Sequence, residues 1–331
     1  MSDASSSKVV SLCSPQSVGT GSFGAGTPRI VRAIDVPSVG QQPEMFAVAV
    51  GTTAHDLYLV KVNPDLSFDS QHLPLAATYD LWSANVVHGN LLVGCLDTGD
   101  GHGYLKAISS DWNGYTAQQY GGTPVLDPPL APLATGTTAL YALVDTSGAL
   151  AMEVIDMNGV TVSSKPANEA MPARVSVAGT EAGAFVVASR ADGTCAAFFV
   201  DANATSGVKT SIPSCASPAA ATLPDGTAAI AYVSGTQIRL HIVPPAPLVA
   251  SDFEIGSGSN PRITAQHGAA GFFVAWTDPV TSQIDLGAFD AGGGVSNQTN
   301  APGATFGFLP AADRAFWVAG SALMTTGICI Q

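Results

Sequence analysis

The sequence predicts an all-β fold, and three observations support this class. Gly and Pro are abundant, at 35 and 22 of 331 residues, as in chains with many short strands and tight turns. Apolar residues come in short runs, and no long window shows the 3.6-residue spacing of a helix. With 46% hydrophobic and 11% charged residues, the chain can bury a sizeable core, and this composition excludes disorder.

One apolar motif recurs along the chain at a nearly constant spacing. It is clearest in GFFVAWT, residues 271–277, which is centred on Val274. The equivalent positions are Val48, Val93, Ala142, Val186, Ile230, Val274 and Trp317, and successive positions differ by 45, 49, 44, 44, 44 and 43 residues. This regularity predicts seven copies of one structural unit.

Each unit is expected to contain four strands. In the unit around Val274, the first strand is predicted to begin at Arg262, the second is the apolar motif and the third covers 284–289. A weak polar fourth strand follows a turn in which Asp precedes Gly. The same turn is expected at Asp111, Asp156, Asp201 and Asp290. Asp suits this position because its carboxylate can accept a backbone N–H from two residues further on, and Gly adopts a positive φ.

A period in the low forties with four strands per unit predicts a seven-bladed β-propeller in a single domain spanning 1–331. The last unit lacks a fourth strand, and an N-terminal clasp strand at 8–13 is expected to supply it and so close the ring. Residues 14–28 form a Gly/Ser-rich insert. The blades are expected at about 29–75, 76–122, 123–167, 168–214, 215–257, 258–302 and 303–331. A β-solenoid is the rival fold, but its coils are usually shorter and its ends have no reason to join.

Four of the five cysteines fit two bridges between the third and fourth strands of a blade. The expected pairs are Cys195–Cys215 within one blade and Cys13–Cys329 across the clasp. Four unrelated buried thiols are the alternative, and Cys95 on a second strand is expected to be an inert core residue. Disulfides favour a secreted, periplasmic or cell-surface protein whose signal peptide is absent from this chain. A cytoplasmic location is the alternative.

The formal charge of −13 disfavours polyanionic partners. The sequence contains no Lys/Arg cluster, so nucleic acid and acidic membrane surfaces are not expected to bind. It also contains no apolar stretch of 18 residues, so membrane insertion is not expected. The expected partner is a protein or a glycan, and the sequence leaves the oligomeric state open.

Three of the seven arginines are predicted to open first strands. Arg29, Arg174 and Arg262 occur in the contexts TPRIV, PARVS and NPRIT. First strands line the central channel of a propeller, so these side chains are expected to surround one mouth of it. Guanidinium groups bind carboxylates and other anions bidentately, which suggests an anion site. The alternative is that each arginine pairs with a loop Asp or is simply solvated.

The turn DTGDGHG, residues 97–103, is a candidate calcium site. Asp97, Asp100 and His102 lie on a Gly-rich loop, and Ca²⁺ prefers oxygen ligands on such loops. The turn lacks the third carboxylate and the closing Glu of the EF-hand loop. A plain solvated turn is therefore the alternative.

The segment SSDWNGYT, residues 109–116, resembles the Asp-box turn of sialidase-like propellers, with one extra residue. The box is a folding element in that family, so the resemblance implies a propeller fold and not an activity. Trp112 and Tyr115 would lie at the tip of this turn, and Trp82 on a first strand. Exposed aromatic rings stack on sugars, so these three are candidate ligand contacts. Trp276 and Trp317 lie on second strands and are expected to be core residues.

The sequence carries no recognisable catalytic constellation and nominates no catalytic residue, although propeller active sites can be assembled from distant loops. Three functions remain open: a non-catalytic extracytoplasmic binding platform, a carbohydrate-binding lectin, and a hydrolase or lyase acting on an anionic substrate. The first is preferred, with the ligand at the channel mouth or on the blade-top loops. Asn203 and Asn297 begin N-glycosylation sequons.

Overall fold

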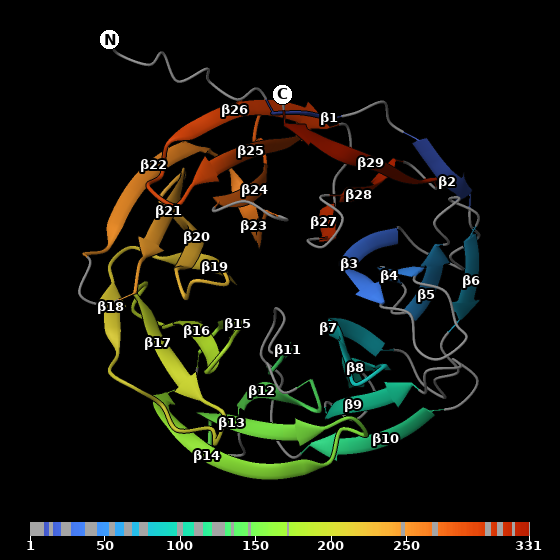
Figure 1. Ribbon diagram of the computed structural model, residues 1–331, viewed down its shortest axis with the longest axis vertical. Helices are drawn as coiled ribbons and strands as arrows, with labels where there is room; N and C mark the ends of the chain where they lie inside the picture. The colour runs from blue at the N-terminus through green and yellow to red at the C-terminus, as the bar shows by residue number, and fades with distance from the viewer. Residues whose placement is uncertain are drawn as a thin grey trace.

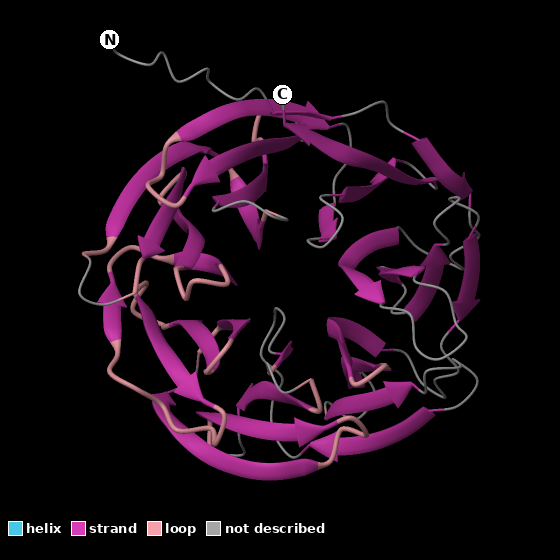
Figure 2. Ribbon diagram, viewed as in Figure 1, coloured by secondary structure: helices cyan, strands magenta, loops and turns pink. Residues whose placement is uncertain are grey.

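The structure is a computed structural model of the whole chain. It describes residues 10–12, 16–20, 28–36, 45–52, 57–62, 68–72, 79–97, 102–108, 115–120, 130–133, 136–144, 147–170, 172–245, 249–266, 271–301, 306–309, 314–319 and 322–330. These ranges contain strands and loops but no helix, as Figure 2 shows, and so no helix that could cross a membrane.

The described strands form antiparallel sheets, most of which contain four strands that are consecutive in the sequence. The first sheet contains β3 (Pro28–Val36), β4 (Met45–Thr52), β5 (Leu57–Val62) and β6 (Phe68–His72). The second contains β7 (Tyr79–Val87), β8 (Asn90–Asp97), β9 (Gly103–Ile108) and β10 (Tyr115–Tyr120). The third contains β11 (Leu130–Pro132), β12 (Thr138–Val144), β13 (Ala149–Asp156) and β14 (Thr161–Ala170). The fourth sheet contains β15 (Arg174–Thr180), β16 (Gly183–Ser189), β17 (Cys195–Asp201) and β18 (Thr210–Ile212). The fifth contains β19 (Ala216–Thr222), β20 (Ala228–Ser234), β21 (Gln237–Val243) and β22 (Ser251–Ser257). The sixth contains β23 (Ser259–Ala265), β24 (Gly271–Thr277), β25 (Ile284–Asp290) and β26 (Val295–Ala301).

The remaining sheet joins the two ends of the chain. It contains β27 (Phe306–Leu309), β28 (Arg314–Ala319) and β29 (Ala322–Ile330), and the N-terminal strands β1 (Val10–Leu12) and β2 (Gln16–Thr20) both pair with β29. In the register of β1, Val10 lies opposite Ile330 and Leu12 opposite Ile328.

The sheets lie side by side around a common centre (Figure 1). In each four-stranded sheet the first strand is innermost and the fourth lies at the rim. Neighbouring inner strands are joined by hydrogen bonds that span about one repeat. The amide of Ala220 in β19 donates to Ser176 Oγ in β15 over 3.0 Å, and the hydroxyl of Thr222 donates to the carbonyl of Gly179. The repeat spacing therefore brings equivalent strands of successive units together.

The second strands form the core, as the sequence predicted. Every residue of β16 is buried, as are all but the last of β24. Trp276 and Trp317 are each only 1% exposed, which confirms them as core residues. Trp276 packs between the β19–β22 and β23–β26 sheets, where a Cβ on Gly256 would lie 2.7 Å from its ring. Glycine is required at 256 because the two sheets approach so closely.

The predicted Asp turns between third and fourth strands are present at three described sites. Asp156, Asp201 and Asp290 each use Oδ1 to accept the amides of the residues two and four positions further on. Gly159 and Gly293 then adopt a positive φ. In the Asp201 turn this position is Ala204, at φ +65°. The aspartate bonds therefore form the turn even where the residue with positive φ is not a glycine.

Candidate functional site

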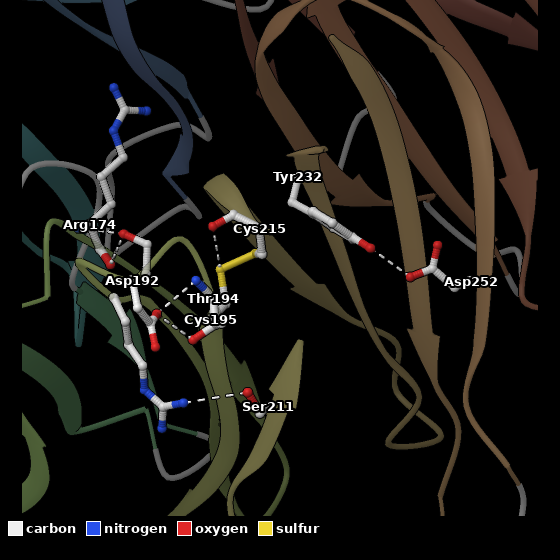
Figure 3. The surroundings of a disulfide bond; sticks show 10 residues. Arg174, Asp192, Thr194, Cys195, Ser211, Cys215, Tyr232 and Asp252 are labelled. Atoms are coloured by element: carbon white, nitrogen blue, oxygen red, sulfur yellow. Dashed lines mark hydrogen bonds between the residues drawn. A yellow bond between two sulfur atoms is a disulfide. The ribbon is translucent and has the colours of Figure 1, made fainter. Parts of the chain in front are cut away.

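Arg174 is the first residue of β15, one of the innermost strands (Figure 1). It pairs with Ser189, and Ser189 pairs with Cys195, so these three residues lie at one end of the β15–β18 sheet. The amide of Arg174 donates to Ser189 Oγ over 2.9 Å, and that hydroxyl donates back to the carbonyl of Arg174 over 3.4 Å. Ser189 thus fixes the backbone of Arg174, and the half-buried side chain extends away from the Cys195–Cys215 disulfide (Figure 3). We name this end of the sheets the arginine end.

The three predicted arginines do not share one level. Arg29 pairs with Gly51 and Arg174 with Ser189, and both partners lie three residues beyond the centre of their apolar motif. Arg262 pairs with Ala275, only one residue beyond Val274. It is the fourth residue of β23 and does not open it, because the strand begins at Ser259 and is bulged before Arg262. Asn260, at φ +50°, lies inside that bulge, and Arg262 is thereby set two positions deeper than Arg174.

Arg174 and Arg262 are nevertheless on equivalent faces of their sheets. Side chains alternate along a strand, so Arg174 shares a face with Ser176, which bonds the following sheet. Arg262 shares a face with its partner Ala275, which packs against the following β27–β29 sheet. The arrangement places Arg174 and Arg262 on innermost strands, each on the face turned towards the next sheet.

The other sequence candidates are described only in part. Trp82 lies in β7, Asp97 ends β8 and Tyr115 begins β10, but their side chains are not among the described features. His102 directly precedes β9 and is half-buried. Asp100 and Trp112 lie outside the described residues. Among the side chains the structure describes, no three His, Cys, Asp or Glu residues gather as metal ligands, and a calcium site at Asp97, Asp100 and His102 stays a prediction.

An ion cluster joins the β11–β14 and β15–β18 sheets, and we name this contact the ionic seam. Glu169, near the end of β14, accepts two bonds from Arg190, at 2.8 and 2.9 Å, and one from Lys209 Nζ at 2.8 Å. Lys209 also donates to the carbonyls of Ala167 and Asn168. The bonds from Arg190 hold the pKa of the Glu169 carboxyl below its usual value despite its burial. The sequence did not indicate this cluster, because its members lie in two loops and an outer strand of different units.

The next contact, between the β15–β18 and β19–β22 sheets, contains a disulfide, and we name it the disulfide seam. Cys195 and Cys215 are bonded and buried, which confirms the predicted pair (Figure 3). Cys215 does not lie on the fourth strand as expected. β18 ends at Ile212, and Cys215 lies in the segment that crosses to β19, where its amide donates to the carbonyl of Gly193 over 2.8 Å. The predicted Cys13–Cys329 bond lies outside the described residues, although Ser11 in β1 is opposite Cys329.

A second polar group lies within the β19–β22 sheet, beside the disulfide seam. The buried Tyr232 donates its hydroxyl to Asp252 Oδ2 over 2.6 Å, and Arg239 donates to Oδ1 over 2.6 Å. His241 Nδ1 lies 3.3 Å from Oδ2. Burial, with the adjacent Asp252 carboxylate, raises the pKa of Tyr232 to about 12. The sequence placed Tyr232 correctly on a second strand. It did not identify Asp252 as the hydrogen-bond partner of Tyr232; the only signal was that a buried tyrosine hydroxyl needs a partner.

Neither cluster is arranged as an activated catalytic group. The nucleophilic form of tyrosine is the deprotonated one, and the raised pKa of Tyr232 makes that form rarer at neutral pH. The carboxylate of Glu169 is bonded by both Arg190 and Lys209. The Glu169 cluster joins adjacent sheets, whereas the Tyr232 group links β20, β21 and β22 within one sheet. The arginine end is therefore the candidate binding site.

Comparison with known proteins identifies the fold. No protein-family model matches the chain, and no curated protein matches its sequence. Among solved structures, hydrazine synthase of Kuenenia stuttgartiensis is similar at 11% identity and a TM-score of 0.67, covering 93% of this chain and 97% of that one. BBS1N in complex with ARL6DN is similar at 13% identity and a TM-score of 0.62, covering 96% of each chain.

Two lectins are also similar in structure. SapL1 lectin, in complex with alpha methyl fucoside, has 14% identity and a TM-score of 0.53, covering 87% of this chain and 99% of the lectin. The six-bladed fucose-recognising Aleuria aurantia lectin has 11% identity and a TM-score of 0.54, covering 83% of this chain and 95% of the lectin. At these identities the likeness concerns the fold alone. The chain is an all-β protein of four-stranded antiparallel sheets with the β-propeller fold.

Proposed function

We propose that this chain is a seven-bladed β-propeller that acts outside the cytoplasm as a non-catalytic binding platform, with a protein or glycan ligand at its arginine end. The seven-bladed form is supported by the sheet topology, because the described sheets follow one another along the chain at about the spacing of the sequence repeats. Closure of the ring is supported by the pairing of β1 with β29. An oxidising location is supported by the Cys195–Cys215 disulfide.

The observation that carries the binding proposal is the position of Arg174 and Arg262. Both lie on innermost strands, in a chain whose formal charge is −13. Ser189 bonds both backbone groups of Arg174, so the backbone at this position is held before any ligand arrives. Guanidinium groups favour carboxylate or other anionic groups on the ligand.

The test is a binding screen with matched variants. The labelled full chain is applied to an array of acidic, neutral and fucosylated glycans and to a panel of extracellular proteins. Arg174→Ala and Arg262→Ala are expected to weaken any ligand found by tenfold or more, whereas Lys165→Ala, which removes the same charge from the rim strand β14, is expected to leave it unchanged. Retention of full binding by both arginine variants would remove the basis for the site.

A carbohydrate-binding function is the second candidate. It is supported by the two structurally similar lectins, which bind or recognise fucose. Trp82, Trp112 and Tyr115 are the aromatic residues proposed to stack on a sugar. Alanine at these three positions is expected to abolish array signals without changing protein-ligand binding, and an array with no signals rules this candidate out.

A hydrolase or lyase acting on an anionic substrate remains the third candidate, and it uses the same arginine end. It differs from the platform in one observable respect, because product must appear when the full chain is incubated with the acidic glycan that it binds. Unchanged substrate after prolonged incubation supports the platform.

A further inference from the structure

We propose that Asn203 is the acceptor of an N-linked glycan, attached when the chain passes through a secretory compartment that contains an oligosaccharyl transferase. The motif Asn203-Ala204-Thr205 is a sequon in the turn between β17 and β18, where Asn203 and Thr205 are exposed and Ala204 is buried. A sequon on a surface turn of a disulfide-bonded protein is the setting in which such glycans occur.

The turn holds its shape without the Asn203 side chain. Asp201 Oδ1 accepts the amides of Asn203 and Thr205, at 2.9 and 2.7 Å, and the amide of Ala204 donates to the carbonyl of Asp201 over 3.0 Å. In the described part of the chain, no hydrogen bond involves the Asn203 carboxamide, and the residue is exposed. A sugar on Nδ2 therefore displaces no bond that forms the turn.

The modification requires a donor and a defined bond exchange. The Nδ2 of Asn203 attacks the anomeric carbon of an oligosaccharide linked to a lipid diphosphate. The new C–N bond forms as the bond from that carbon to the phosphate oxygen breaks, and the lipid diphosphate leaves with the electron pair. The amide proton passes to a base of the transferase. The threonine two residues on completes the motif, and Thr205 is exposed in the same turn.

The two sequons differ in their structural setting. Asn297 lies within strand β26 and pairs with Ala288 in β25, whereas Asn203 lies in a turn between strands. The sequon at 203 is also enclosed by the Cys195–Cys215 disulfide. The disulfide and the glycan would therefore both form in the oxidising secretory compartment.

The glycan would lie at the end of the sheet opposite the arginine end. Cys195 is paired with Ser189 beside Arg174, and Asp201 is paired with Gly183 at the far end of the same strands. Seven residues of strand separate the two ends by about 20 Å. A glycan at Asn203 leaves the proposed ligand site open, although its attachment does not depend on that site.

The test uses the full chain secreted from cultured animal cells behind a signal peptide. Its intact mass is measured before and after peptide-N-glycosidase treatment in ¹⁸O water, and peptides are mapped after reduction. We expect most molecules to carry a glycan that is lost on treatment, with Asn203 converted to ¹⁸O-labelled Asp. Asn203→Gln and Thr205→Ala are expected to lose this glycan, whereas Thr205→Ser and Asn297→Gln retain it.

Disulfide-bonded secreted protein with unmodified Asn203 overturns the proposal, provided that a control glycoprotein from the same cells is glycosylated. If secretion fails, translation of the same chain with microsomal membranes gives the same readout. The assay measures no ligand, so its outcome is independent of the arginine end.

Discussion

The β15–β18 sheet is held to its two neighbours in different ways. On one side, the ionic seam fixes Glu169 between Arg190 and Lys209 at the rim. On the other, the disulfide seam fixes the crossing segment to β17 through Cys195 and Cys215, and Tyr232 bonds Asp252 nearby. Both seams also contain a buried apolar cluster. The two contacts share apolar packing, but one is held by an ion cluster and the other by a disulfide.

Because of this difference, the contribution of each seam to stability is expected to depend on a different solution condition. A carboxylate held by cations depends on pH and, because Arg190 and Lys209 are 29% and 23% exposed, also on salt. A disulfide depends on reductant and hardly on pH or salt. Four experiments use this contrast, and they follow in order of expected effect.

Removal of the disulfide is expected to have the largest effect. The bond closes a loop with a sequence separation of 20, and its loss through Cys195→Ala with Cys215→Ala should lower the free energy of unfolding by about 3 kcal/mol. Urea unfolding of the native chain with and without reductant provides the comparison. The double variant should have the same free energy of unfolding as the reduced native chain, and adding reductant should not change it. Equal stability of the oxidised native chain and the variant would contradict this role of the disulfide.

Glu169→Gln should weaken the ionic seam by about 2 kcal/mol, since it leaves two cations facing a neutral amide. Urea unfolding at neutral pH measures the change. Glu181→Gln, at an exposed position in the β15–β16 turn, is the matched control and should change stability little. A loss no greater than that of the control would show that the cluster contributes nothing.

The ionic seam should also respond to acid. The pKa of Glu169 is lowered in the folded chain, so its contribution is fully present above the unfolded pKa near 4.5 and is lost as pH falls through the folded value. The difference in unfolding free energy between the native chain and Glu169→Gln should therefore shrink on acidification. A difference that stays constant down to strongly acidic pH rules out this linkage.

Tyr232→Phe should have the smallest effect, about 1 kcal/mol, because Asp252 keeps its bonds to Arg239. The raised pKa of Tyr232, about 12, gives the opposite pH dependence: its contribution is present below the unfolded pKa of 10.0 and is lost as pH rises towards 12. Ultraviolet titration of tyrosinate should show one late-ionising group in the native chain that is absent from Tyr232→Phe. Identical titration curves would contradict the assignment.

Much of the fold could be predicted, because it depends on regular spacing. The repeats of the motif around Val274 indicated four-stranded units, and the apolar second strands placed Trp276 and Trp317 in the core. The aspartate turns followed from the hydrogen-bonding capacity of a single side chain, as at Asp201. Cys195 and Cys215 were paired correctly because one repeat places them on adjacent segments.

The candidate site was less predictable, because it depends on local departures from regularity. The bulge before Arg262 sets that residue deeper than Arg174. Pro261 inside the bulge was the available signal, because proline within a strand marks an edge or a bulge, but it does not give the resulting change of register. Glu169 contacts Arg190 and Lys209 only because two neighbouring sheets pack together, so no local sequence pattern indicates the cluster.

The position of the disulfide also determines how the protein would withstand proteolysis. The segment between Cys195 and Cys215 includes an exposed turn, in which Val208 is 93% exposed. Exposed turns of this kind are where proteases cut. A single cut there would leave both parts of the chain covalently joined through sulfur, so that the nicked protein would migrate as one species until it is reduced.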